Sequence, residues 1–287
     1  MKTRRLFYED VYIQEFEAIV LSCEEKDGKY HVILNATAFY PEGGGQPADK
    51  GMIDNIPVAD VQYIDGELCH IMESPLEEGA QVVGKIDWNW RFDLMQQHSG
   101  EHIVSGMIHE KYGYENVGFH MGEEIITIDL SGMLTWQQVQ EIEKKVNYYI
   151  WMNQQVNIFY PDERQRKFIP YRSKKELTGE IRLVEFPGAD LCACCGLHVT
   201  HASQIGLVKI LSCKKFRDGV RMEMLSGKRA LDYLSGSTEQ NSQIAVSLSA
   251  KENETKEAVQ RLLDEVYDLK GQLAQGKQKS SEAKAAS

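Results

Sequence analysis

The chain has 287 residues, of which 42% are hydrophobic and 26% charged, and its formal net charge at pH 7 is −11. This length and composition are ordinary for a globular protein of more than one domain, and no apolar run approaches the roughly 20 residues of a membrane-spanning helix. The acidic balance argues against a protein that holds nucleic acid mainly through bulk charge. The N-terminus starts basic but has no apolar run behind it, so we expect no signal peptide and a cytoplasmic location.

Residues 1–90 carry the signals of short strands joined by tight turns. Asp27-Gly28 and Asp65-Gly66 each separate two segments of strand-like residues, and such dipeptides favour the turns of β-hairpins. The flanking segments are residues 16–23, 30–37, 58–64 and 67–72. Several short strands at this spacing predict a small β-barrel as the first domain.

From Arg91 the period of the apolar positions becomes that of a helix, which we expect to end at Gly113. Residues 135–138 form a capping box that predicts the start of a second helix. Segments with strand character follow at residues 156–160, 181–186, 207–211 and 220–225. Helices mixed with a largely antiparallel sheet predict the α+β class, with a two-layer α/β domain over residues 91–236.

Residues 237–287 differ from the rest of the chain. Their apolar residues recur in steps of three and four, which is the seam of a coiled coil, at Val259, Leu262, Val266, Leu269 and Leu273. A lone amphipathic helix needs a partner for its apolar face, so we expect either an intramolecular helical hairpin or a homodimer through this helix. The polar, alanine-rich end, residues 276–287, is expected to fray.

Two pairs of candidate metal ligands share a spacing of four residues. His98 and His102 lie one turn apart on the expected first helix, and Cys194 and His198 repeat that spacing. Each pair alone is a weak signal, but together they supply three imidazoles and a thiolate, a donor set that zinc favours. From the sequence alone, any cysteine of the cluster within residues 192–195 qualifies as the fourth ligand.

Two further questions about this site stay open at the level of the residues. Four protein ligands close a tetrahedral zinc site, whereas catalytic zinc keeps one position for water, so the metal either organises the pocket or exchanges a ligand. Residues 98–102 also match the H-x-x-E-H pattern of inverted zinc peptidases, in which Glu101 is the general base. That interpretation needs a downstream carboxylate ligand, for which Glu141 and Glu143 are available, and it leaves the second pair unexplained.

At these residues the chain resembles the editing domain of alanyl-tRNA synthetase and its free-standing AlaX relatives. Blocks in the family's order and spacing carry the resemblance, at residues 35–47, 95–102, 118–129 and 194–206. The final helix resembles the start of the C-terminal extension of the long AlaX form, of which we expect this chain to be a truncated version. The chain departs from the family at Asn35, Cys195 and Leu197, where aspartate, glycine and threonine are frequent, and none of these changes removes a ligand.

The resemblance implies a zinc-dependent hydrolase that removes wrongly attached serine, and also glycine, from the acceptor end of tRNA(Ala). A synthetase pocket for alanine discriminates poorly against either amino acid, so a second, hydrolytic sieve is needed. Thr37 is the group expected to hydrogen-bond the serine hydroxyl, which alanine lacks. By the resemblance, the zinc ligands are His98, His102, Cys194 and His198. The other implied substrate-binding residues are Gly43, Gly44, Gly45, Gln46 and His120.

Glu101 is expected to be either a catalytic base or a solvent-facing helical residue. Two alternative functions stay open beside the hydrolase. A non-catalytic tRNA-binding module with structural zinc would bind tRNA without deacylating it, and the four-ligand set keeps this alternative open. A zinc peptidase would cleave peptides and ignore charged tRNA, but it uses only one of the motifs.

Overall fold

The structure is a computed structural model that describes residues 2–173 and 179–285. The chain divides into two compact units, residues 1–231 and residues 232–287. Within the described residues, no helix has both the length and the apolar character needed to cross a membrane. The predicted domain boundaries stay a prediction, at residues 1–90, 91–236 and 237–287.

Strands from the first part of the chain pair in a closed antiparallel cycle, in the order β2-β3-β7-β6-β5-β8. They are β2 (Glu15–Lys26), β3 (Lys29–Leu34), β5 (Gly51–Ile53), β6 (Ile56–Ile64), β7 (Glu67–Met72) and β8 (Gln81–Ile86). In β2, Phe16, Ala18 and Val20 are buried and alternate with exposed residues, so one face of the strand forms the barrel core. Asp27 and Gly28 have φ of +52° and +77°, as the predicted hairpin turn requires.

Helix α2 (Trp88–Tyr112) leaves the barrel and runs through the core of the first unit. The Asp87 side chain caps it by accepting a hydrogen bond from the backbone N–H of Trp90 (3.1 Å), and Gly113 ends it in the left-handed conformation at the predicted position. Every residue from Leu94 to Ile108 is buried. The first candidate metal pair therefore lies inside the protein.

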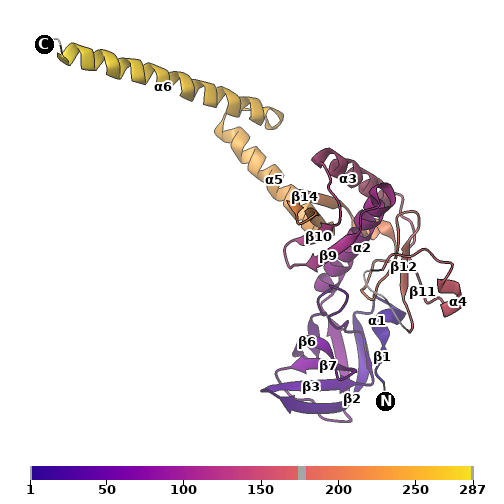
Figure 1. Ribbon diagram of the computed structural model, residues 1–287. Coiled ribbons are helices and arrows are strands. Elements are labelled where there is room, and N and C mark those ends of the chain that lie inside the picture. The colour runs from indigo at the N-terminus through magenta and orange to yellow at the C-terminus, as the bar shows by residue number, and fades with distance from the viewer. Residues whose placement is uncertain (1, 174–178, 286–287) are drawn as a thin grey trace. The chain divides into compact units, whose positions relative to one another are not determined.

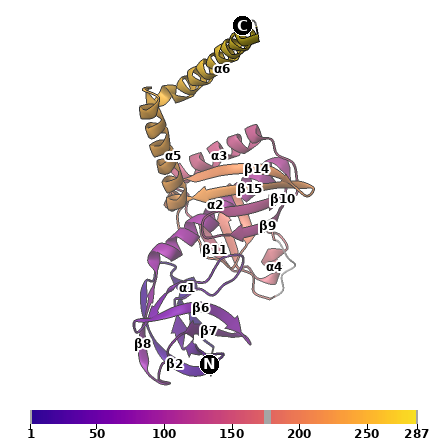
Figure 2. The same cartoon turned by 90° about the vertical axis from the view of Figure 1, so that its left-hand side faces the viewer.

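An antiparallel sheet in the order β14-β15-β10-β9 packs with two helices. Its strands are β9 (Asn116–Met121), β10 (Ile126–Leu130), β14 (Val208–Phe216) and β15 (Gly219–Ser226). Helix α3 (Trp136–Trp151) lies along the sheet beside β14 (Figure 2). The predicted capping box is confirmed, because Thr135 and Gln138 exchange both of its hydrogen bonds.

A second, smaller antiparallel sheet holds the C-terminal metal pair. Its strands are β11 (Asn157–Phe159), β12 (Leu183–Phe186) and β13 (Asp190–Ala193), and α4 (Glu163–Arg166) lies between β11 and β12 in the chain. Cys194 follows directly after β13. Helices combined with antiparallel sheets confirm the predicted α+β class.

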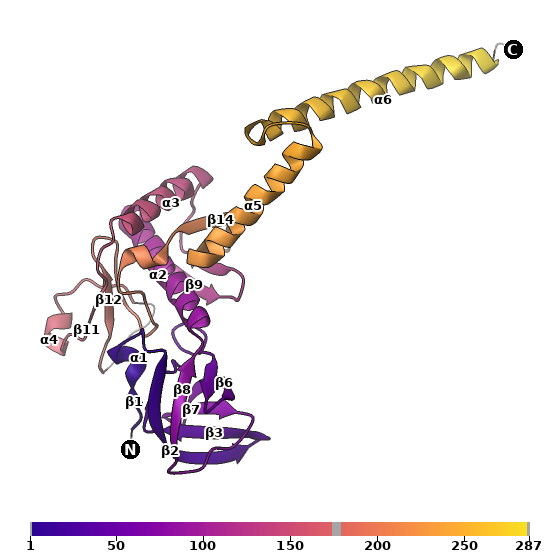
Figure 3. The ribbon, with the colours of Figure 1, turned by 180° about the vertical axis from the view of Figure 1, so that it is seen from behind.

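A short N-terminal segment joins the barrel to the second sheet. Strand β1 (Arg4–Arg5) pairs in parallel with β4 (Ala36–Thr37), and α1 (Leu6–Glu9) follows at once. Phe7 is buried, and its ring packs edge-on against Tyr40 with 5.5 Å between the centroids. Helix α1 lies at the end of the barrel nearest β12 (Figure 1, Figure 3).

A buried ion pair ties the barrel to α2. The guanidinium of Arg91 is fully buried, and its Nε donates to Asp49 Oδ1 (2.7 Å) while Nη2 contacts Oδ2. Its remaining donors reach backbone carbonyls of Val11 (3.1 Å) and Ala38 (2.5 Å). Because each charge is paired and hydrogen-bonded, the cost of burying them is offset, and removal of either partner would leave an uncompensated buried charge.

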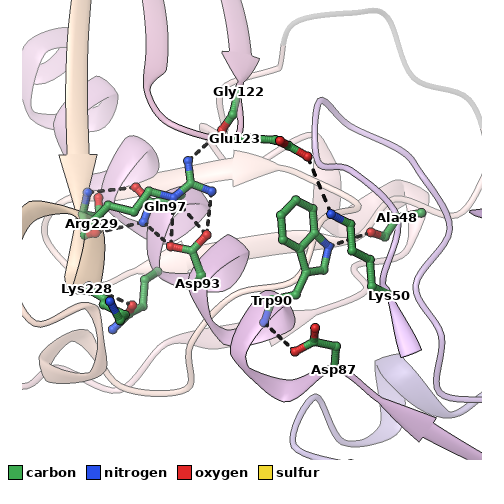
Figure 4. Close-up of polar contacts among 12 residues, drawn as sticks. Ala48, Lys50, Asp87, Trp90, Asp93, Gln97, Gly122, Glu123, Lys228 and Arg229 are labelled. Carbon is green, nitrogen blue, oxygen red and sulfur yellow. Dashed lines mark hydrogen bonds and ion pairs between the residues drawn. The ribbon is translucent and has the colours of Figure 1, made fainter. Parts of the chain in front are cut away.

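A second ion pair fixes the other side of α2 (Figure 4). Asp93 is held by Arg229, whose Nε lies 2.9 Å from Oδ2 and whose Nη1 donates to the carbonyl of Gly122 (2.7 Å). One turn earlier, Trp90 donates its indole N–H to the carbonyl of Ala48 (2.9 Å). These contacts fix the rotation of α2 and hence the direction in which its histidines point.

The second unit is helical. Helix α5 (Gly227–Ser247) is followed by a 3-10 turn, η2 (Glu252–Glu254), and by α6 (Thr255–Ala285). Apolar side chains of α6 at the predicted seam are exposed, and the partner expected for them stays a prediction. Residues 276–285 continue α6, since Lys, Glu, Gln and Ala favour helix. The fraying expected of this end stays a prediction. Residues 286–287 of that segment lie outside the described residues.

Candidate metal centre and its cavity

The two predicted pairs meet in one cluster. His98 and His102 project from α2, while Cys194 and His198 come from the loop after β13. One ligand atom from each of these residues lies within 4.8 Å of the others. The imidazole centroids are 4.5 to 5.2 Å apart, and Cys194 Sγ is 3.5 Å from His98 Nε2.

Neighbouring side chains fix the tautomers of the two α2 histidines. Gln46 Oε1 accepts a hydrogen bond from the backbone N–H of Leu197 (2.9 Å), which identifies this atom as the oxygen of the amide. It lies 3.0 Å from His98 Nδ1, so Nδ1 carries the proton and donates. Nε2 of His98 is then left with its lone pair on the side of Cys194, as a metal ligand requires.

Asp190 does the same for the second histidine. Its Oδ2 accepts from His102 Nδ1 (2.8 Å), and its Oδ1 accepts from Arg172 Nε (2.8 Å). Although burial alone would raise it, these hydrogen bonds hold the pKa of Asp190 below its usual range. An ionised carboxylate behind a histidine orients the ring and strengthens it as a ligand.

The protonation states of Cys194 and His198 are also those that metal ligands have. Burial by itself would raise the pKa of Cys194, but the positive charges that His98 and His102 carry when protonated, and a hydrogen bond from His102, hold that pKa well below its usual range. They favour the thiolate, and a bound metal cation would take the place of those protons. Burial, followed by the effect of His98, lowers the pKa of His198 well below its usual range and keeps it neutral. By contrast, burial raises the pKa of the Cys192 thiol.

His198 supplies the test of whether a metal fits. His198 is 1% exposed, and neither of its ring nitrogens has a hydrogen-bond partner among the described residues. A buried imidazole without a partner is costly, and a cation between three imidazoles and a thiolate would satisfy it. This donor set suits zinc.

The cluster forms part of the wall of a cavity of about 590 Å³. His98, His102, Cys194 and Glu101 line this cavity, and so do Gly44 and Gly45. A space of this volume is within the range of small-molecule sites. The wall also carries three arginines and several aromatic rings, among them Arg5, Arg172, Arg182, Tyr8 and Tyr160.

Glu101 does not face solvent. It is 3% exposed, and its Oε1 accepts from Ser105 Oγ (2.6 Å) and from the side-chain amide of Asn116. The solvent-facing alternative is therefore wrong, because α2 is buried on this side by β9 and β13. Its role as a base stays a prediction.

The glycine-rich loop packs against the metal loop. Gly44 and Gly45 have φ of +62° and +83°, and a Cβ at Gly44 would lie 2.8 Å from Cys195 Sγ. A Cβ at Gly45 would lie 2.8 Å from the ring of Phe119, which stacks on His98. Gly43 is not in the cavity wall, since its backbone pairs with Gln46.

The other predicted substrate residues, Thr37, Gln46 and His120, do not line the cavity of the candidate metal cluster. Thr37 is fully buried in β4, and its Oγ1 lies 2.8 Å from His70 Nε2. His120 lines a second cavity of about 350 Å³, which shares Phe119 and Gly45 with the first. Gln46 contacts His98 instead of lining either cavity. The substrate-binding roles of these residues stay predictions.

Sequence reasoning missed the residues that support the ligands. Asp190 and Arg172 belong to this group, as do Tyr8 and Arg182 on the cavity wall. A carboxylate four residues before Cys194 was a usable signal for Asp190, since metal-bound histidines often donate to carboxylates. Tyr8 and Arg182 carry no such signal, because they reach the cavity only through the tertiary fold.

Comparisons with known proteins agree with this arrangement. The family model described as threonyl and alanyl tRNA synthetase second additional domain matches residues 181–222, and the model for class II (A) tRNA synthetases matches residues 5–90. The chain is 34% identical to alanyl-tRNA editing protein Aarsd1-B of Xenopus laevis, over 91% of this chain and 67% of that protein. It is 32% identical to alanyl-tRNA editing protein AlaX-L of Pyrococcus horikoshii, over 80% of this chain and 59% of the relative. It is 35% identical to the alanine–tRNA ligase of Ignicoccus hospitalis, over 80% of this chain and 26% of that enzyme.

Proposed function

The chain belongs to the family of alanyl-tRNA editing proteins, and on that premise we propose that it hydrolyses the ester bond of mischarged tRNA(Ala). The amino acids removed are serine and, secondarily, glycine. The observation that carries the proposal is the cluster of three imidazoles and a thiolate, of which His98, His102 and Cys194 line a cavity that the glycine-rich loop also lines.

In this proposal His98, His102, Cys194 and His198 hold a zinc ion. When bound, zinc supplies a Lewis acid for the ester carbonyl and lowers the pKa of a coordinated water. Gln46 and Asp190 keep the protons of the two α2 histidines on the outer nitrogens, so the inner nitrogens stay available.

Glu101 is the proposed acceptor of the proton from the attacking water. Ser105 and Asn116 fix its carboxylate at the cavity wall beside the ligands. The positive φ of Gly44 and Gly45 and their lack of side chains leave their part of the cavity wall open to close approach by the terminal adenosine.

Thr37 is the proposed source of selectivity for serine. Its Oγ1 accepts from the backbone N–H of Phe39 (3.1 Å) and pairs with His70. A site that hydrogen-bonds a substrate hydroxyl discriminates strongly against the analogue without one. The Thr37→Val variant should relax the preference for seryl over alanyl substrate and retain its zinc, and unchanged selectivity would refute this role.

The peptidase alternative lacks support in the geometry. Its third ligand would be Glu141 or Glu143, but Glu141 pairs with Lys111 (3.0 Å) and Glu143 pairs with Lys209 (2.8 Å). Neither belongs to a potential metal group among the described residues. The non-catalytic tRNA-binding module stays the second candidate, because four protein ligands would complete a tetrahedral zinc.

The test compares hydrolysis of seryl-tRNA(Ala) and alanyl-tRNA(Ala) by the purified protein. The Cys194→Ala, His198→Ala double variant removes half of the donor set, and Cys213→Ala is the matched control outside the cluster. We expect rapid loss of serine alone, abolished in the double variant together with zinc and unchanged in the control. A zinc-containing protein that binds tRNA and leaves the serine attached would favour the binding module.

A further inference from the structure

The N-terminal segment reaches the metal loop. Tyr8, in α1, donates its hydroxyl proton to the backbone carbonyl of Cys195 (2.7 Å), the residue next to a proposed ligand. Burial raises the pKa of Tyr8, so the hydroxyl keeps its proton. This hydrogen bond fixes the Tyr8 ring and the adjoining Arg5 in the wall of the main cavity.

Two guanidinium groups contact the same ring. The Cζ atom of Arg5 lies 5.2 Å from the centroid of Tyr8, and that of Arg182 lies 5.0 Å from it. Arg182 immediately precedes β12 and is only 8% exposed. Its Nη1 donates to the carbonyls of Cys194 and Gly196 (2.9 Å each), which fixes the guanidinium against the metal loop.

Arg182 is a buried cation that has no counter-ion among the described residues. Two arginines are buried among the described residues, and Arg91 is paired with Asp49. Arg182 forms no ion pair with any carboxylate in the described part of the chain, and its Nε and Nη2 have no hydrogen-bond partner there. Arg172, on the same cavity wall, is already paired with Asp190. A buried charge is costly unless it is paired.

Arg5, which is partly buried, also lacks a counter-ion in the described part of the chain. Glu180, also in the wall, forms no ion pair with either arginine. On a chain of net charge −11, two adjacent arginines that open to one cavity form a local anion-attracting site. Guanidinium groups match phosphate geometry through paired donors.

We propose that Arg5 and Arg182, which both contact the ring of Tyr8, together bind one backbone phosphodiester of the RNA acceptor end. This subsite rests on the proposed function and specifies how the substrate is positioned, namely by a phosphate contact beside the metal cluster. Such contacts position nucleic acid without reading its sequence.

The test uses seryl-minihelix RNA in which one phosphodiester near the 3′ end at a time is replaced by a neutral methylphosphonate. In the wild-type protein, one position should lower kcat/KM roughly ten- to hundredfold, as expected for loss of a charge-assisted hydrogen bond. In the Arg5→Gln variant, the methylphosphonate at that position should lower kcat/KM less than about threefold, because the contact between the protein and this phosphate is already weakened.

Matched variants keep the result interpretable. Arg217→Gln removes an exposed arginine that also lies over an aromatic ring, Phe216, but outside the cavity, so it should retain the full methylphosphonate effect. Arg182→Lys keeps the charge but loses the planar guanidinium. Its methylphosphonate effect on kcat/KM should therefore lie between those of the wild type and Arg5→Gln. Zinc content identifies any variant whose metal loop is disturbed.

The same pairs of protein variant and methylphosphonate position are also compared by their affinity for uncharged minihelix RNA. This measurement does not depend on hydrolysis, so it tests the phosphate subsite separately from the proposed function. A protein that hydrolyses the wild-type substrate but shows equal methylphosphonate effects with and without Arg5 would overturn the phosphate subsite. A protein that never hydrolyses would overturn the proposed function, and the affinity couplings would still decide the subsite.

Discussion

Asp190 links a proposed metal ligand, His102, to an arginine of the cavity wall, Arg172. It accepts from His102 on one oxygen and from Arg172 on the other, and all three side chains lie at the boundary of α2 and β13. Its carboxylate thus determines which nitrogen of His102 carries the proton. Geometry at the metal therefore depends on a residue that is not a proposed ligand.

We predict that Asp190→Asn weakens metal binding by about 10- to 100-fold, the usual effect of losing a partner behind a metal-bound histidine. Zinc affinity is measured by competition with a chromophoric chelator. Asp129→Asn is the control, since Asp129 also pairs with an arginine, Arg221, but on the sheet of β10. Equal affinities for the two variants would contradict the role of Asp190.

His70 is predicted to make stability depend on pH. Burial lowers its pKa from 6.5 to about 4, so between these values the unfolded chain binds a proton that the folded chain does not. Stability is then fully present above pH 6.5 and declines as the pH falls toward 4, by roughly 3 kcal/mol over the whole window.

Urea unfolding of wild type and His70→Gln across this window measures that loss. The stability advantage of the wild type should shrink as the pH falls, because only the wild type has the buried imidazole. The exposed His120 provides the control variant His120→Gln, which should run parallel to wild type. Parallel curves for His70→Gln would show that the imidazole does not cause the decline.

Among single residues, the spacing in the sequence was enough to predict the candidate metal ligands, whereas the choice of Cys194 among the clustered cysteines came from the family resemblance. Burial of Glu101 was not predictable. Polar residues beside it on α2 look like a solvent-facing surface in the sequence, yet Gln97 pairs with the backbone of Ser226, far along the chain. Hydrogen-bond partners this far apart in the chain leave no pattern in the local sequence from which burial could be predicted.

At the scale of elements, close packing of α2 on β13 depends on a glycine. A Cβ at Gly106 would lie 2.3 Å from the backbone oxygen of Ala189 and 2.6 Å from Cβ of Asp190. We predict that Gly106→Ala lowers the free energy of unfolding by about 1–3 kcal/mol through overpacking. Displacement of Asp190 should also weaken metal binding.

Tryptophan fluorescence in urea measures this effect, because all the tryptophans lie in residues 1–231. Gly271→Ala in α6 is the control, since a Cβ there meets nothing within 4 Å. Gly271→Ala should not change the urea concentration at the midpoint of the fluorescence transition. An unchanged transition for Gly106→Ala would mean that the helix and strand separate easily.

Elements governed by local rules were predictable, including the Asp27-Gly28 turn, the Thr135 capping box and the Gly113 helix end. The residues at which strands end were less predictable from the sequence. Strand β14 extends to Phe216, beyond the predicted segment 207–211, because its pairing with β15 continues past the apolar residues. Backbone pairing with a neighbour maintains a strand whose own composition has become polar.

At the scale of the whole molecule, the candidate metal centre joins parts distant in sequence, so its occupancy should stabilise the first unit. With free zinc several hundred times above its Kd, the gain is about 3–4 kcal/mol. We predict that chelation lowers the fluorescence unfolding midpoint of the wild type and leaves Cys194→Ser unaffected. A midpoint that chelation does not change would show that no metal is bound to this cluster in the folded protein.

The order in which the ligands occur along the chain also bears on synthesis. His98 and His102 emerge from the ribosome first, while the thiolate of Cys194 lies about ninety residues further on, an interval of roughly 5–20 seconds of translation. Until then the nascent chain offers a metal only two imidazoles. Under the proposed function, zinc would therefore be bound only late in the synthesis of each molecule, and a cell short of zinc would release a protein whose candidate metal centre is incomplete.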